Sequence, residues 1–298
     1  MSDKWTATDI PSQTGRTIVI TGANSGIGLV AARGLAAAGA RVVLAVRDTT
    51  KGASAAGSIA GDTEVRGLDL ADLSSIRAFA EGWEGQIDVL VNNAGVMAVP
   101  KGRTKDGFEM QTGTNHLGHF ALTNLLLPKI TDRVVTVSSG AHRIGNLDVD
   151  DLNWERRRYQ RWLAYGQSKL SNLLFTLELE RRLADAGSDV HAFACHPGYA
   201  STNLQSHTGN VVQNTLMTVG NKLLAQSGEM GALPTMYAAT MDIPGGSYVG
   251  PDSFQEQRGH PTLVGRSGRA SDIAEAGRLW LRSEDMTGVS FPLAGATA

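Results

Sequence analysis

The sequence predicts an α/β protein, a single doubly wound (Rossmann) domain built on a parallel sheet of roughly seven strands. Strand-like and helix-like patterns alternate along the chain. The strand segments are apolar throughout, which is typical of a parallel sheet covered by helices on both faces. No repeat, low-complexity tract or Pro/Ser-rich linker divides the 298 residues. We therefore expect one domain over residues 1–298.

Short β-branched runs predict the strands, at Thr17–Thr21, Arg41–Val46, Glu64–Leu68, Ile87–Val91, Arg133–Ser138 and Asp189–Ala194. Helical spacing follows the first strand, where Ile27, Val30, Ala31, Leu35 and Ala38 recur on one face. A later helix places Leu170, Leu173, Leu174 and Leu177 together, continuing to Leu183. The C-terminal third is less regular, with expected helices near Val211–Gln226 and Ser271–Ser283 around a strand at Ser247–Gly250.

The composition is that of an ordinary globular protein, with 27 basic against 29 acidic residues and a net charge of −2. This balance gives no reason to expect a nucleic acid or an anionic membrane as a partner. The single cysteine, Cys195, excludes an internal disulfide and fits a reducing compartment. The isolated histidines have no paired spacing for a metal site. We expect a soluble, cytoplasmic chain without a signal peptide or stable membrane insertion.

A glycine-rich segment, Thr21-Gly22-Ala23-Asn24-Ser25-Gly26-Ile27-Gly28, lies between the first strand and the first helix. Glycines there permit a tight turn and let the backbone approach a pyrophosphate, whose charge the helix N-terminus favours. The spacing G-x-x-x-G-x-G differs from the G-x-G-x-x-G of other dinucleotide folds, and no Gly-Lys-Ser/Thr of a P-loop is present. A plain connection would be the alternative, but this context favours dinucleotide binding.

Four further motifs follow in order: Asn92-Asn93-Ala94-Gly95, Asn115 within Thr114–Gly118, Val137-Ser138-Ser139, and Tyr165-Gly166-Gln167-Ser168-Lys169. His196-Pro197-Gly198 then follows the sixth strand. With the glycine-rich turn, these motifs make the chain resemble the short-chain dehydrogenase/reductase family over most of its length. The resemblance implies an NAD(P)-dependent enzyme that interconverts a carbonyl and an alcohol by hydride transfer.

The resemblance also implies the site residues. The catalytic set is Asn115, Ser139, Tyr165 and Lys169. The cofactor-binding set is Gly22, Asn24, Ser25, Gly26, Ile27, Gly28, Arg47, Asp69, Leu70, Asn93, Ala94, Gly95, Tyr165, Lys169, Pro197, Gly198 and Thr202. Ser139 would hydrogen-bond the substrate oxygen, and Asn115 would hold a water that links Lys169 to solvent. Lys169 would also hold the nicotinamide ribose.

The spacing of Tyr165 and Lys169 suits proton transfer. Tyrosine has an ordinary pKa near 10 and is a poor base at neutral pH unless its phenolate is stabilised. A lysine four residues on lies on the same helix face. We therefore expect Lys169 to lower the pKa of Tyr165 through its positive charge. Alone, this pair would more often be a solvated helix face, but the accompanying motifs reverse that reading.

The segment between Ser139 and Tyr165 is longer than in many members of the family. Residues 148–159, Asp-Val-Asp-Asp-Leu-Asn-Trp-Glu-Arg-Arg-Arg-Tyr, look like an insertion. A similar insertion with D-L-N-W occurs in the retinol-dehydrogenase-like branch of the family, which this chain resembles. Ser139 remains the expected catalytic serine, with Ser138 as the alternative. The run Arg156–Arg158 is read as an exposed charged loop, against an anionic-substrate or nucleic-acid site.

Cofactor choice depends on Arg47 and Asp48, which follow the second strand. An acidic residue there holds the ribose 2′-OH of NAD, whereas an arginine suits the 2′-phosphate of NADP. Arg47 comes first and Asp48 is placed to cap a helix, so NADP is the preferred cofactor and NAD the alternative. Asp69 would contact the adenine by the family pattern, or else cap the helix that begins near Asp72.

The substrate side is less specified. Residues 199–228 occupy the position of the family's substrate lid, and their apolar content suits a small apolar carbonyl or alcohol, of the retinal, aliphatic aldehyde or ketone type. Packing against the core or a partner explains the same residues equally well. Relatives in the family are commonly dimers or tetramers, so a homodimer or homotetramer is expected. An epimerase or dehydratase on the same fold, or a non-catalytic cofactor-sensing protein, is the alternative function.

Overall fold

The computed structural model describes residues 4–198, 227–253 and 255–293. Eight strands form one sheet in the order β3-β2-β1-β4-β5-β6-β7-β8. Their bounds are β1 Thr17–Thr21, β2 Arg41–Val46, β3 Thr63–Gly67, β4 Ile87–Asn92, β5 Ile130–Val137, β6 His191–Cys195, β7 Tyr248–Ser253 and β8 Arg258–Leu263. The first seven pair in parallel, and β8 pairs antiparallel to β7. The expected doubly wound fold is confirmed, with one antiparallel edge strand more than predicted.

The longer helices are α1 Gly26–Ala37, α2 Thr49–Ala56, α3 Leu73–Glu81, α5 Gly118–Leu126, α6 Arg161–Asp185, α8 Gly228–Thr240 and α9 Ile273–Thr287. Short turns complete the described chain: η1 Ala7–Asp9, α4 Met110–Thr112, η2 Gly113–Leu117, η3 Leu127–Lys129, η4 Gly140–Ile144, η5 Val149–Asp151 and η7 Gly268–Ser271. The expected C-terminal helix begins at Ile273 because Asp272 caps it, accepting a hydrogen bond from Glu275 N. The expected helix at Val211–Gln226 and the lid residues 199–226 lie outside the described residues.

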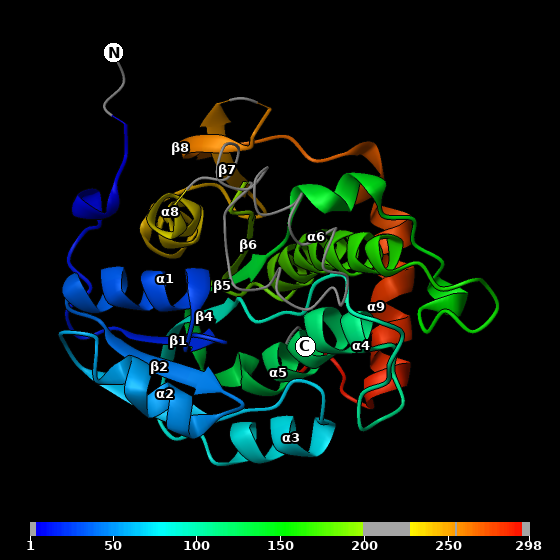
Figure 1. Cartoon of the computed structure of the whole chain (residues 1–298), viewed down its shortest axis with the longest axis horizontal. Helices are drawn as coiled ribbons and strands as arrows, with labels where there is room; N and C mark the ends of the chain where they lie inside the picture. The colour runs from blue at the N-terminus through cyan, green and yellow to red at the C-terminus, as the bar shows by residue number, and fades with distance from the viewer. Residues whose placement is uncertain (1–3, 199–226, 254, 294–298) are drawn as a thin grey trace, which may run out of the picture.

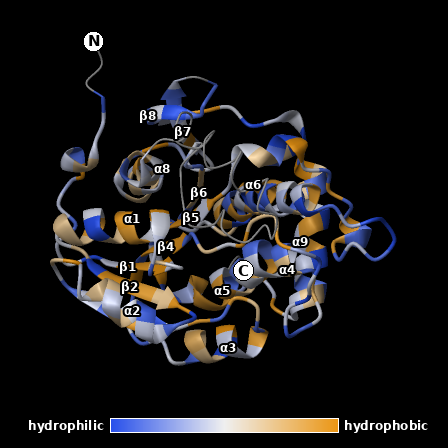
Figure 2. Cartoon of the chain, viewed as in Figure 1, coloured by the Kyte–Doolittle hydropathy of each residue, from blue (hydrophilic) through white to orange (hydrophobic). Residues whose placement is uncertain are grey.

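Alternate side chains of each strand enter two separate cores, one on each face of the sheet. On β1, Ile18 and Ile20 pack with residues of α1 and α8, whereas Val19 packs with residues of α3, α5 and α6. Helix α9 covers α6 from outside, and its Trp280 stacks on Phe175 of α6 with ring centroids 5.7 Å apart. Figure 1 shows α1 and α8 on one side of the sheet and α3 and α5 on the other, and β2 is mostly hydrophobic in Figure 2. This double burial explains why the strands are apolar throughout.

The strand order reverses between β1 and β4, since β2 and β3 extend to one side and β5 to β8 to the other. In open α/β sheets such a switch point opens a crevice at the carboxyl ends of the strands. The motifs after β1, β4, β5 and β6 all lie at these ends. Among the described residues, no helix is both long and apolar enough to cross a membrane.

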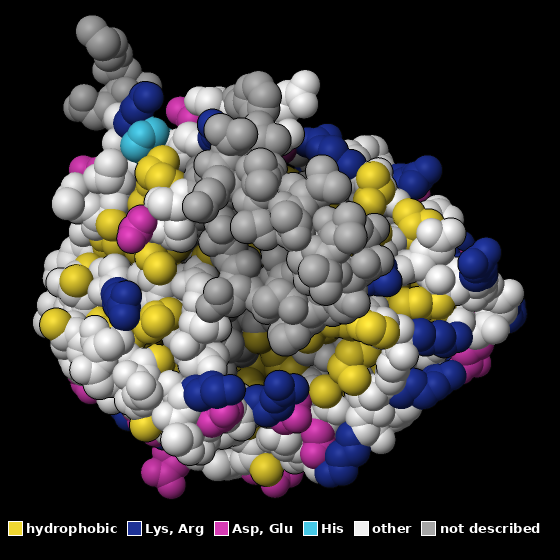
Figure 3. Space-filling view, viewed as in Figure 1, with side chains coloured by type: hydrophobic (Ala, Val, Ile, Leu, Met, Phe, Trp, Pro, Cys, Tyr) yellow, Lys and Arg dark blue, Asp and Glu magenta, His cyan; other side chains and the backbone are white. Residues whose placement is uncertain are grey.

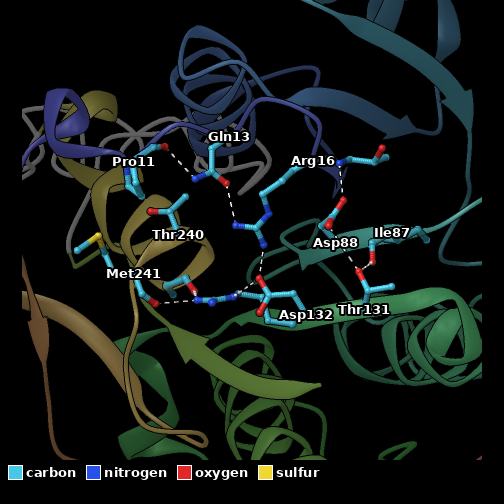
Figure 4. Close-up of polar contacts among 12 residues, drawn as sticks. Pro11, Gln13, Arg16, Ile87, Asp88, Thr131, Asp132, Thr240 and Met241 are labelled. Atoms are coloured by element: carbon cyan, nitrogen blue, oxygen red, sulfur yellow. Dashed lines mark hydrogen bonds and ion pairs between the residues drawn. The ribbon is translucent and has the colours of Figure 1, made fainter. Parts of the chain in front are cut away.

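At the opposite end of the strands, where β1 and β5 begin, a network of polar contacts holds the sheet together (Figure 4). Asp132 at the start of β5 accepts hydrogen bonds from Arg16, before β1, and from Arg133 Nε. Arg133 Nη1 donates to Met241 O at 2.7 Å and Ala238 O at 3.2 Å, at the C-terminal end of α8. A cation there also complements the helix dipole. One carboxylate therefore connects β1, β5 and α8.

We expect Asp132→Ala to lower the free energy of unfolding by about 1–3 kcal/mol, because two arginines lose their acceptor. Urea unfolding at pH 7 measures the change. Asp285→Ala is the control, since Asp285 forms an exposed ion pair with Arg282, which is expected to contribute at most about 0.5 kcal/mol. Equal losses in the two variants would contradict a special role for the Asp132 network.

Candidate active site

A cleft of about 960 Å³ opens at the switch point. The expected cofactor residues that line it are Gly22, Asn24, Ser25, Gly26, Ile27, Gly28, Arg47, Asn93, Ala94, Gly95, Tyr165, Lys169 and Pro197. Leu29, Lys51, Ser54, Ala55, Ser58, Val96, Met97, Val99, Val137 and Ser138 also line it. The prediction did not include Lys51 and Ser54, whose spacing places them on one side of α2, or Ser58, which follows that helix.

Thr21 ties the two strands that flank the switch point. Its hydroxyl oxygen accepts hydrogen bonds from Asn93 N and Ala94 N, both at 2.9 Å, and its carbonyl accepts from Asn93 Nδ2 at 2.7 Å. The other asparagine of the motif, Asn92, is buried and donates to Thr123 on α5. The Asn-Asn-Ala-Gly segment therefore fixes the end of β4 to the end of β1 and forms one wall of the cleft.

The glycine-rich turn leaves no room for side chains where it meets this wall. Gly22 and Gly26 adopt positive φ of 68° and 55°, which glycine tolerates. A Cβ on Gly28 would lie 2.5 Å from Asn93 Nδ2 and 2.8 Å from Gly22 O. Ser25, the N-cap of α1, makes no side-chain capping hydrogen bond, and the first turn of α1 contains no acidic residue. The first N–H groups of α1 can therefore bind a phosphate that lies in the cleft.

The end of the cleft beside α2 is positively charged. Arg47 and Lys51 line it, and no aspartate or glutamate stands among the lining residues of the described chain. Asp48 caps α2, as expected, by accepting from Lys51 N at 3.0 Å, and its carboxylate lies 3.4 Å from Lys51 Nζ. Its hydrogen bond with the Lys51 amide, the Lys51 ammonium and the Thr50 amide lower the pKa of Asp48. The carboxylate is therefore engaged at the helix end.

Asp69 and Leu70 do not line this cleft. Asp69 Oδ1 accepts from Ala71 N at 2.9 Å, and its backbone N–H donates to Ser75 on α3. The cap of α3 is Asp72, which accepts from Ser74 N, so the alternative role of Asp69 as the cap of that helix is wrong. Gly198 adopts φ +65° and packs against the β7–β8 connection. Thr202 lies outside the described residues.

Tyr165 and Lys169 project from one face of α6 and are buried, with 9% and 5% of their surface exposed. Lys169 Nζ donates to Val137 O at 2.9 Å and lies 5.8 Å from the centre of the Tyr165 ring. A Cβ on Gly95 would lie 3.7 Å from this Nζ and 3.0 Å from Asn115 Oδ1. The structure therefore brings Tyr165, Lys169, Asn115 and Gly95 together.

Burial sets the ionisation of this pair. Burial raises the pKa of Tyr165 to about 12, and the hydrogen bond with Ser139 acts in the opposite direction. Burial also lowers the pKa of Lys169 to about 8. The pKa of Tyr165 is therefore raised, whereas the sequence predicted that Lys169 would lower it, because the loss of hydration outweighs the effect of the distant ammonium. At neutral pH the phenol is protonated and the lysine is cationic.

The two serines after β5 have different roles. Ser138 is buried and donates to the carbonyl of Lys169 at 2.8 Å, so its hydroxyl is engaged in packing β5 against α6. Ser139 begins the turn η4, where its oxygen accepts from Ala141 N at 3.2 Å, and it interacts with the Tyr165 hydroxyl. This geometry favours Ser139 over Ser138 as the partner of Tyr165.

Asn115 lies in η2, a turn of π-helix at Gly113–Leu117. Such turns often mark functional sites in helices. The buried amide is fully engaged: Oδ1 accepts from Val96 N at 2.8 Å, and Nδ2 donates to Val96 O and Ser168 Oγ, both at 2.9 Å. Asn115 therefore holds the chain after β4 and packs it against α6 beside Lys169.

Comparison with known proteins gives consistent findings. A model described as short chain dehydrogenase matches residues 16–210. Retinol dehydrogenase 13 of Homo sapiens is 43% identical over 297 residues, covering 93% of this chain and 86% of that protein. The crystal structure of an uncharacterized protein from Mycobacterium paratuberculosis is 56% identical, with a TM-score of 0.85 over 97% of this chain and 99% of that one. A candidate NAD(P) dependent gluconate 5-dehydrogenase from Beutenbergia cavernae, with NADP bound at low occupancy, is 26% identical, with a TM-score of 0.59 over 77% and 91% of the two chains.

We expect Lys169→Met to stabilise the fold while removing activity. The pKa of Lys169 is about 8 in the folded chain against an ordinary value of 10.5, so its charge opposes folding. This penalty is complete below pH 8 and disappears as the pH rises to 10.5. Val137 O keeps its hydrogen bond from Asn172 at 3.1 Å in the variant. The free energy of unfolding should rise by about 1–3 kcal/mol at pH 7.

Urea unfolding of both proteins at pH 7 and at pH 10 measures this effect. The gain should be larger at pH 7 than at pH 10. A variant that is less stable than the wild type at pH 7 would contradict a buried ammonium with a lowered pKa.

Proposed function

The chain belongs to the short-chain dehydrogenase family and is an NAD(P)-dependent oxidoreductase, and on this premise we propose that it reduces an apolar aldehyde or ketone with NADPH. The observation that carries the proposal is that Tyr165 and Lys169 line a cleft with an apolar wall and a cationic end beside α2, with Ser139 hydrogen-bonded to Tyr165. Similarity to retinol dehydrogenase 13 also supports an apolar carbonyl compound of the retinal or aliphatic aldehyde type.

The residues of the cleft fit a nicotinamide dinucleotide. The uncapped N-terminus of α1 and the glycine-rich turn would hold its pyrophosphate. Asn93, Ala94 and Gly95 would lie along it, and Lys169 would hold the nicotinamide ribose. When bound in reduced form, this cofactor supplies the hydride for the carbonyl carbon.

The chain itself supplies the proton. Because Tyr165 is protonated at neutral pH, its hydroxyl can donate a proton to the substrate oxygen as negative charge develops there. Ser139 donates a hydrogen bond to the same oxygen and stabilises that charge. Lys169 is cationic and stabilises the phenolate that remains. These protonation states favour carbonyl reduction near neutral pH, and alcohol oxidation would need a higher pH to deprotonate Tyr165.

The substrate end of the cleft is apolar. Met97 and Val99 line the same cleft as Tyr165, and the ring of Trp162, 39% exposed, meets the Tyr165 ring edge-on with ring centroids 6.3 Å apart. Figure 3 shows hydrophobic side chains gathered beside the position of α4, between charged groups at the lower and right-hand edges. Burial of an apolar substrate against such a surface favours binding, and the surface offers few hydrogen-bond partners to the hydroxyls of a sugar.

We expect Tyr165→Phe to reduce turnover by about 10²-fold or more, since the proton donor is lost. The affinity for NADPH should change less than about twofold, because the ring and Lys169 remain. Steady-state reduction of retinal, aliphatic aldehydes, steroids and quinones identifies the substrate, and NADPH fluorescence titration measures cofactor binding. A variant with unreduced turnover would refute the assignment of Tyr165.

We expect Arg47→Ala to weaken NADPH binding about tenfold and NADH binding less than about twofold, because an arginine beside the 2′-phosphate is lost. Arg41→Ala at the other end of β2 is a control with the same change in charge, and it should leave both affinities unchanged. Fluorescence titration with both cofactors is the measurement. Equal losses of NADPH and NADH affinity in Arg47→Ala would show that NADP is not preferred through this residue.

A further inference from the structure

We propose that the inserted segment 148–159 positions the substrate wall, residues Val96–Val99. Through Tyr159 it fixes this wall, so that Met97 and Val99 select long apolar carbonyl compounds over short ones. The inference rests on the proposed function, because it names the substrate class of the same site. It also gives a role to the insertion that distinguishes this chain from many members of its family.

The wall is held in a strained conformation. Ala98 is buried and has a φ of 50°, in the left-handed region that an alanine rarely adopts. Its N–H donates to Gln111 Oε1 at 2.8 Å. The Asn115 amide pairs with both backbone groups of Val96 on one side, and the Tyr159 hydroxyl donates to Val99 O at 3.0 Å on the other. Side chains therefore hold the backbone of Val96, Ala98 and Val99, on both sides of and at the strained residue.

Tyr159 is the hub of these contacts. Besides Val99 O, its hydroxyl lies 3.2 Å from Glu109 Oε1 and accepts from Gln111 Nε2 at 2.9 Å. Gln111 and Glu109 are buried. Burial and the neighbouring Glu109 carboxylate raise the pKa of Tyr159 above its ordinary value, so the hydroxyl keeps its proton and remains a donor. One phenol thus holds both the strained wall and the glutamine that bonds to Ala98.

The rest of the insertion fixes Tyr159 in place. The Trp154 ring meets Tyr159 edge-on at 5.7 Å, and the Arg157 guanidinium lies 4.0 Å above Trp154. Arg157 also pairs with the buried Asp151 at 3.3 Å, so this arginine of the charged run has a structural partner. Asn153 Oδ1 accepts from Glu109 N at 2.9 Å, and Lys101 Nζ donates to Trp154 O at 3.1 Å. The insertion is therefore docked onto the chain that carries the wall.

A fixed wall of this kind can discriminate by length. Met97 and Val99 offer apolar surface and no side-chain hydrogen-bond donor, so each further methylene that they cover adds to binding. A wall that moves must be ordered when the substrate binds, and that cost reduces the gain. Loss of the Tyr159 hydroxyl should therefore weaken the preference for long substrates and leave the proton donor unchanged.

The test is Tyr159→Phe in the full chain, with Tyr237→Phe on α8 as the matched loss of a hydroxyl far from the wall. We expect the ratio of kcat/KM for decanal to kcat/KM for propanal to fall about tenfold in Tyr159→Phe, through KM more than kcat. NADPH affinity should stay within about twofold. Unchanged discrimination, or an equal loss for both aldehydes, would overturn the proposal.

Hydrogen–deuterium exchange provides a readout that needs no turnover. The Ala98 amide should exchange about tenfold faster in Tyr159→Phe than in the wild type or Tyr237→Phe. Unchanged exchange would overturn the role of Tyr159 in fixing the wall, even if the chain reduces carbonyls. Failure of the wild type to reduce any carbonyl would refute the proposed function, and the exchange experiment would still test the role of Tyr159. If Tyr159→Phe folds poorly, Met97→Ala is the alternative variant. It should lower the discrimination between the two aldehydes without faster exchange at Ala98, and unchanged discrimination would show that the wall assignment is wrong.

Discussion

The site depends on one buried hydroxyl, that of Thr21, at the point where the sheet changes direction. It accepts from the two amides that begin the wall after β4, and it lies 2.9 Å from His119 Nε2. Burial lowers the pKa of His119 to about 4, so the ring is neutral. With Nδ1 donating to Asn115 O at 3.0 Å, Nε2 must accept, and the Thr21 hydroxyl donates to it. Thr21 and His119 together thereby fix strand β1, the segment after β4 and the π-turn to one another.

This arrangement extends from the sheet to the reacting groups in a few contacts. Asn115 connects the π-turn to Val96 on the wall and to Ser168 beside Lys169 on α6. Lys169 in turn reaches back to the end of β5 at Val137. Lys169, the segment after β4 and the π-turn therefore belong to one connected set of hydrogen bonds. Preorganisation of this kind lets the chain stabilise developing charge without reorganising around it.

The sequence alone predicts the parts of the structure that are local. The bounds of β1 and β2 were predicted because apolar runs end at arginine or glycine, and the glycine turn and Tyr165–Lys169 are short motifs with fixed neighbours. Strand β8 escaped prediction because Arg258–Leu263 is an edge strand with a glycine and a proline and no apolar run. Helix α8 contains Pro234 and is buried over most of its length, so no amphipathic period marks it. The raised pKa of Tyr165 and the Tyr159–Val99 contact, which spans 60 residues, arise from burial and tertiary packing that spacing does not reveal.

The groups expected to react lie at the carboxyl ends of the strands, and a stabilising polar network lies at their amino ends. At the carboxyl ends of the strands the chain buries an ammonium and holds an alanine at positive φ, and both of these oppose folding. At the amino ends of the strands, Asp132 accepts hydrogen bonds from two arginines and helps to bind the end of α8 to β5. The strained groups persist because the two cores and this network surround them with packed structure. The same burial that makes the Lys169 ammonium costly keeps Tyr165 protonated, which is the state from which the proposed reduction starts, so part of the destabilisation at the cleft follows from that chemistry.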